Sequence, residues 1–163
     1  MMPVIRLQHA VFDPVAECAK LELGDAGAVA SFTGLVRGEG GLVALELEHY
    51  PAMTEEALKR IAADAAGRWA LAGLTIVHRV GRMAPGERIV FVGAASRHRG
   101  DAINAMHFVI DWLKTDAPFW KREEFADGHS AWVEAREGDA VQREKWSDRT
   151  KKGCRGAAPL SGK

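Results

Sequence analysis

The sequence predicts an α+β domain with a mainly antiparallel sheet and packed helices. Segments typical of strands occur in adjacent pairs joined by short glycine- or proline-containing loops, instead of alternating regularly with helices. A GxGxxG turn after the first strand and a Walker A loop are both missing from the sequence, which disfavours the nucleotide-binding α/β folds that those motifs mark. A length of 163 residues with 47% apolar residues suits one domain with a core of its own.

The first predicted helix begins after a short strand over residues 3–8. Asp13 is a good N-cap, and Pro14 suits the first helical position because its ring fixes φ near the helical value. We expect this helix to bury Val15, Cys18 and Ala19, with Cys18 acting as a small core residue and not as a nucleophile.

Two strands and a second helix follow. Residues 27–37 are rich in small and β-branched residues and end at Arg37, before a glycine-rich loop. Residues 42–49 alternate apolar and polar side chains, which is typical of a half-buried antiparallel strand. Pro51 is expected to break this strand, and Thr54 to cap the next helix.

A hairpin is predicted from residues 74–83 and 88–95, which flank a Pro85-Gly86 turn. The second of these strands is almost continuously apolar, so we expect it to be central and covered on both faces.

The stretch 96–123 then predicts a helix with cations at both ends. Its apolar residues recur with the 3.6-residue period of a helix, at Ala102, Ile103, Met106, Val109, Ile110 and Leu113. Asp101 suits its start, and Pro118 is a stop signal just beyond Lys114. A lysine at a helix C-terminus is favoured by the helix dipole by roughly 0.3–1 kcal/mol, so this pattern by itself does not require a function.

The C-terminal part is predicted to hold a last strand over residues 130–135 and a polar segment to Trp146. Residues 147–163 have little apolar content, and we expect a disordered tail. The predicted organisation is therefore one domain over residues 1–146 and a tail over 147–163.

Charge and cysteine usage exclude several classes of protein. The formal net charge is zero, which disfavours general nucleic-acid binding, although five arginines face one glutamate between residues 78 and 99 and suggest a local anion site. The two cysteines form neither a disulfide framework nor a CxxC zinc motif. The absence of a long apolar run at the N-terminus and of a stretch of 18 apolar residues predicts a cytoplasmic protein.

Four segments together resemble the large, catalytic subunit family of molybdopterin synthase. These segments are GAVASFTGLVRG, HRVGRMAPGE, SRHRGDAINAMHFVIDWLKTDAPFWKRE and HSAWVEA, and the resemblance covers about residues 3–146. The long segment that ends in PFWKRE is the most specific, because it holds several unusual residues at fixed spacing.

The resemblance implies a fold, an activity and partners. The fold would be of the α/β hammerhead type. The activity would be a sulfurtransferase reaction that inserts two sulfurs into cyclic pyranopterin monophosphate and forms the dithiolene of molybdopterin. The sulfur would arrive as a thiocarboxylate on the C-terminus of a small ubiquitin-like subunit, and two large subunits would form a homodimer within a heterotetramer.

The resemblance also implies site residues, and no metal or organic cofactor. The substrate-binding positions fall on Leu35, Val36, Arg37, His98, Arg99, Lys114, Lys121, Arg122 and Glu123. Arginines suit the phosphate of the substrate through their planar guanidinium groups. Lys114 and Lys121 are the candidates for proton transfer and for stabilising developing negative charge, in roles that the sequence leaves open.

Other interpretations remain beside this one. A non-catalytic module that binds a ubiquitin-like tail or a phosphate ligand would need the same basic residues without proton chemistry. His78 and Arg79 are expected to serve packing or a dimer interface more than catalysis, and His107 is expected to be a satisfied core histidine.

Overall fold

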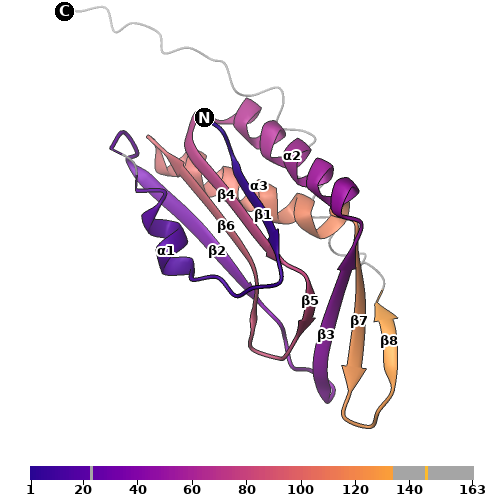
Figure 1. The fold of residues 1–163 in the computed structure, drawn as a ribbon. Coiled ribbons are helices and arrows are strands. Elements are labelled where there is room, and N and C mark those ends of the chain that lie inside the picture. Colours follow the sequence, from indigo (N-terminus) through magenta and orange to yellow (C-terminus); the bar gives the residue numbers. More distant parts are fainter. Residues whose placement is uncertain (23, 134–145, 147–163) are drawn as a thin grey trace, which may run out of the picture.

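The computed structural model describes residues 1–22, 24–133 and 146. Within these residues the chain forms eight strands and three helices, and the strands make two four-stranded sheets that adjoin end to end (Figure 1). Antiparallel pairing dominates both sheets, which confirms the predicted α+β class.

The first sheet carries the main core. Its strand order is β1 (Val4–Gln8), β4 (Leu71–Arg79), β6 (Arg88–Ser96) and β2 (Ala28–Leu35). β1 pairs with β4 in parallel, and the other pairs are antiparallel. The apolar strand β6 is central, as predicted, while β1 and β2 form the two edges.

The second sheet has the order β5 (Gly81–Met83), β3 (Leu42–His49), β7 (Phe119–Phe125) and β8 (Ser130–Val133). The predicted strand over residues 74–83 is divided between the two sheets, because Gly81 adopts a φ of +84° that re-aims the chain. β7 is an element that was not predicted, since no strand was expected after the stop signal at Pro118.

Helices cover both faces of the first sheet (Figure 1). The helices α2 (Pro51–Arg68) and α3 (Arg99–Asp116) pack on one face, and the short helix α1 (Pro14–Ala19) packs on the other. The larger core cluster lies between the sheet and α2 and α3, so burial of this face holds the domain together.

The helix starts differ in part from the prediction. Asp13 caps α1, since its carboxylate accepts a hydrogen bond of 3.0 Å from the Val15 N–H. Val15, however, is 75% exposed, and the buried residue of this helix is Glu17, which forms ion pairs with Arg6 and Lys20. α2 begins at Pro51, so Thr54 is not a cap but a buried residue inside the helix.

The helix α3 ends before Pro118, as predicted, and most of its predicted apolar stripe is confirmed, since Ala102, Val109 and Leu113 are buried and Met106 and Ile110 pack against the core. Ile103 is 51% exposed, whereas Phe108 is fully buried against Trp69. The expectation for His107 was wrong, because half of its side chain is exposed and its Nε2 lies 3.4 Å from a carboxylate oxygen of Asp111.

Trp146 is packed into the main core with 3% of its surface exposed. Its indole N–H donates a hydrogen bond of 2.8 Å to the buried Asp111 carboxylate, and Arg68 donates to its backbone carbonyl. Residues 134–145 and 147–163 lie outside the described residues, so the predicted domain boundary and tail stay predictions. None of the helices in the described part of the chain is long and apolar enough to cross a membrane.

Candidate functional site

Lys114 and Lys121 flank the single turn that joins α3 to β7. Lys114 is exposed in the last turn of α3, and Lys121 is the third residue of β7. The turn is closed by a hydrogen bond of 2.9 Å from the Phe119 N–H to the Ala117 carbonyl. The fold therefore presents both lysines at the same end of the domain.

Lys121 lies on the face of β7 that is turned toward the first sheet. Successive side chains of a strand alternate between faces, so Phe119, Lys121 and Glu123 share one face. In the register of the sheet, Lys121 lies directly opposite Leu47, which is 2% exposed. Lys121 thus borders an apolar cluster, while its own residue surface remains exposed.

Arg122 leaves β7 on the opposite face. Its guanidinium pairs with the Glu46 carboxylate and lies over the Trp132 ring, 6.0 Å from the ring centroid. The hydrogen bond to Glu46, with the charge of that carboxylate, raises the pKa of Arg122 above its ordinary value. Within one chain, the structure does not bring Arg122 to the side on which Lys121 lies.

The end of β2 borders the same apolar cluster as Lys121. Val36 is 4% exposed and packs with Leu47, the residue opposite Lys121. Leu35 is 55% exposed, and the exposed Arg37 guanidinium lies 3.5 Å from the Glu39 carboxylate. The structure therefore places the group Leu35, Val36 and Arg37 next to the inner face of the second sheet.

His98 and Arg99 lie at the other end of α3. His98 occupies the N-cap position without a side-chain cap bond, and Arg99 is the first helical residue; both are exposed. Lys114 follows Arg99 by 15 residues, which corresponds to about 22 Å along the helix axis. One chain therefore does not bring these two residues together with the lysines. A helix N-terminus with an imidazole and a guanidinium is nevertheless well suited to an anion.

The buried residue His78 lies close to the face of β7 that carries Lys121. The His78 ring stacks on the Phe119 ring, with 4.2 Å between centroids and 23° between planes. The pKa of His78 is lowered to about 4, chiefly by burial, while the hydrogen bond to the Arg79 carbonyl opposes this shift and electrostatic repulsion from Lys121 and His49 adds to it. Burial also lowers the pKa of His49, which contacts the Phe119 ring at 6.3 Å.

Sequence reasoning missed the involvement of Phe119 and His49 in this environment. The signal available for His49 was its position at the end of an alternating strand, just before Pro51. Nothing local identified Phe119, because its partners come from β3 and β4.

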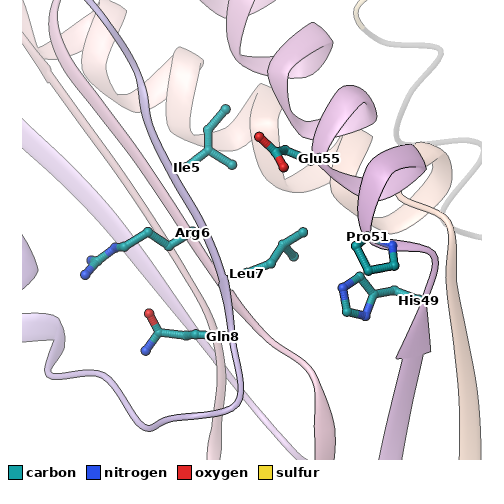
Figure 2. Close-up of a pocket in the computed structure, with 7 residues that line it drawn as sticks. All are labelled: Ile5, Arg6, Leu7, Gln8, His49, Pro51 and Glu55. Atoms are coloured by element: carbon teal, nitrogen blue, oxygen red, sulfur yellow. The ribbon is translucent and has the colours of Figure 1, made fainter.

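A cleft of about 460 Å³ lies between the edge strand β1 and the start of α2 (Figure 2). Ile5 and Leu7 turn toward α2, and Arg6 and Gln8 leave β1 on the other side (Figure 2). The remaining lining residues are His49, Pro51 and Glu55. The residues that the sequence predicted for the site do not line this cleft.

Among the described residues, no group of three or more His, Cys, Asp or Glu side chains could hold a metal ion. The predicted site residues instead supply the amines of Lys114 and Lys121 on either side of the α3–β7 turn and the guanidinium of Arg37 just after β2. Such groups can bind phosphate or carboxylate and can donate protons to a leaving oxygen.

Comparison with known proteins shows extensive similarity. Residues 7–116 match the family model described as MoaE protein. A protein of Mesorhizobium japonicum named "Molybdopterin synthase catalytic subunit" is 52% identical over 150 residues, which is 90% of this chain and 94% of the relative.

Solved structures show the same similarity. The "Molybdopterin biosynthesis MoaE protein from Burkholderia ambifaria MC40-6" superposes with a TM-score of 0.79 at 48% identity, over 90% of this chain and 99% of that one. A Helicobacter pylori structure described as a complex of subunits 1 and 2 of molybdopterin-converting factor has a TM-score of 0.68 over 82% of this chain and 90% of that one. At 20% identity, the latter shows the shared fold alone.

Proposed function

The chain belongs to the MoaE protein family, and from this premise we propose that it works as the catalytic subunit of a molybdopterin synthase. It transfers sulfur from the thiocarboxylated C-terminus of a small ubiquitin-like subunit to cyclic pyranopterin monophosphate, and so forms the dithiolene of molybdopterin. The observation that carries the proposal is the pair Lys114 and Lys121 on either side of one turn, in a chain 52% identical to a named catalytic subunit.

The side chains near this turn match what the reaction needs. Sulfur addition must be followed by loss of oxygen and opening of the cyclic phosphate, and both steps call for a proton donor near developing negative charge. The amines of Lys114 and Lys121 supply that function. Arg37 supplies a planar guanidinium for phosphate, next to the apolar cluster that borders Lys121.

A second copy of the chain supplies His98 and Arg99 to the site. His98 and Arg99 lie about 22 Å along α3 from Lys114, which is too far for one small substrate to touch both groups. The outer edge of β2 pairs with no strand among the described residues, and this strand exposes Val29, Phe32 and Leu35. An edge of this kind is suited to pairing with a second chain.

Antiparallel pairing of two β2 edges around a two-fold axis would bring His98 and Arg99 of one copy close to Arg37 of the other. The start of β2 pairs with the end of β6, where Ala28 lies opposite Ser96, two residues before His98. The end of β2 leads into Arg37. Because the start of one strand lies beside the end of its partner, His98 and Arg99 of one copy approach Arg37 of the other.

The domain boundary and the location of the protein complete the proposal. Burial of Trp146 supports a catalytic domain that extends to residue 146, with residues 147–163 dispensable for the reaction. Cys18 is a free thiol, which fits a cytoplasmic protein.

The test is incubation of the chain with cyclic pyranopterin monophosphate and a thiocarboxylated small subunit, followed by detection of molybdopterin. Calorimetry then separates an enzyme from a module that only binds the tail. Arg99→Ala should weaken binding of the pterin phosphate by roughly 1.5–3 kcal/mol, if it removes a charge-assisted hydrogen bond, and should leave binding of the small subunit nearly unchanged. A tail-binding module would show loss of the small subunit and no affinity for the pterin.

A further inference from the structure

We propose that His78 is a positioning residue for Lys121: its ring holds Phe119, the residue that starts β7, and thereby sets where the Lys121 ammonium lies. This inference rests on the proposed function, since it takes Lys121 as a residue that acts on the substrate. His78 itself lies in the first sheet, on β4, and is 8% exposed.

The stack of His78 on Phe119 lies at the first residue of β7, where the pairing of β7 with β3 begins. Phe119 follows the α3–β7 turn directly, and its neighbour across the sheet is His49, the last residue of β3. The stack of His78 on Phe119 therefore ties this strand end to the first sheet, beside the apolar cluster in which Phe119 and Ile89 of β6 both pack. Lys121 lies two residues further on the same face, about 7 Å along the strand, so a shift of Phe119 moves Lys121 with it.

The orientation of the His78 ring is fixed by its backbone. The Nδ1 atom lies 2.8 Å from the Arg79 carbonyl oxygen, and because a carbonyl can only accept, Nδ1 carries the proton and donates. The Nε2 atom of the neutral ring then carries a lone pair. A ring held in this plane provides a rigid surface for Phe119, which a flexible side chain at this position would not.

The neutral imidazole of His78 can lie close to the Lys121 ammonium without repelling it. The charged and titratable groups that face His78 are Lys121 from β7 and His49 from β3, and Lys121 is close enough for its charge to act on the ring. A lysine or arginine at this position would add a cation beside Lys121 and repel it. A neutral ring at pH 7 offers packing without that repulsion.

The experiment compares three variants in the complex with the thiocarboxylated small subunit. His78→Ala removes the stack, His78→Phe keeps an aromatic ring on Phe119, and Val92→Ala is a control that truncates a fully buried residue of the same sheet. For each variant we measure kcat and KM for the pterin, the melting temperature, and the position of the Lys121 signal in NMR spectra of 13C-methylated lysines.

We expect His78→Ala to lower kcat at least about tenfold and to shift the Lys121 signal, because small displacements of reacting groups have large kinetic effects. His78→Phe should restore kcat to within about threefold and return the signal. Val92→Ala should lower the melting temperature without lowering kcat.

Three results would overturn the inference: an unchanged Lys121 signal in His78→Ala, equal losses of kcat in His78→Phe and His78→Ala, or an equal loss of kcat in Val92→Ala. A wild-type complex that makes no molybdopterin would refute the proposed function instead, while the Lys121 signals would still decide whether His78 positions this lysine.

Discussion

Lys121 and Arg122 are consecutive residues of β7, and their side chains leave the strand on opposite faces. Lys121 lies on the face of Leu47 and Phe119, whereas Arg122 pairs with Glu46 on the outer face of the second sheet. We therefore expect Lys121→Gln to nearly abolish molybdopterin formation and Arg122→Gln to retain most of it. Glu46→Gln breaks the same ion pair and is the matched control. If Arg122→Gln were as inactive as Lys121→Gln while Glu46→Gln stayed active, Arg122 would contact the substrate, as the sequence predicted.

Lys114 should be essential as an amine. Lys114→Ala is expected to nearly abolish turnover with the fold intact, because the side chain is exposed at the end of α3 and contributes little to the core. Lys114→Arg should also be poor, since a guanidinium keeps the charge but does not readily release a proton. Lys59→Ala is the control, because Lys59 is another exposed helical lysine, paired with Glu55 on α2. A wild-type rate for Lys114→Ala would remove this residue from the mechanism.

Two inactive variants should complement each other if the site is shared between copies. At pterin concentrations well below the wild-type KM, Lys114→Ala and Arg99→Ala should each strongly lower the activity of both sites of a homodimer. After unfolding and refolding of an equal mixture, half of the dimers are mixed, and each has one site with both wild-type residues. The expected activity is about a quarter of wild type, as two-fold symmetry requires. Activity no higher than that of the separate variants would mean that one copy holds the whole site.

Trp146 should anchor the domain. Its side chain packs among Trp69 and Phe108 and donates to Asp111, so Trp146→Ala is expected to destabilise the domain by about 3–5 kcal/mol. Urea unfolding measures this difference. Truncation after residue 146 is the control and should change neither stability nor activity. A stable Trp146→Ala variant would place the end of the folded domain before this residue.

His78 should make the stability depend on pH. Its pKa is about 4 in the folded state against 6.5 when exposed, so between these values the unfolded state binds more protons. The contribution of neutral His78 to the free energy of unfolding is therefore fully present above pH 6.5. It is lost as the pH falls from 6.5 toward 4, and it changes no further below pH 4. Between pH 7 and pH 5 the free energy of unfolding should fall by about 2 kcal/mol from this group. His78→Phe should flatten this slope, and an equal slope in wild type and His78→Phe would contradict the assignment to His78.

Local features of the sequence determined several elements correctly. The cap at Asp13, the end of α3 before Pro118 and the central position of the apolar strand β6 all follow from neighbouring residues. The residues proposed for the site came from a motif of fixed spacing. The match to the family model covers residues 7–116, which is most of the chain. Motif spacing names residues, but it does not say which of them share a surface.

Tertiary structure decided those relationships. β7 is a strand because β3, some seventy residues earlier, pairs with it, and a local reading of its charged sequence gave no sign of that partner. The same pairing puts Lys121 and Arg122 on opposite faces and brings Phe119 onto His78. The length of α3 separates Arg99 from Lys114, although the two belong to one motif. Contacts between distant segments depend on how the whole chain packs, whereas caps, stops and apolar periodicity depend on neighbours within a few residues.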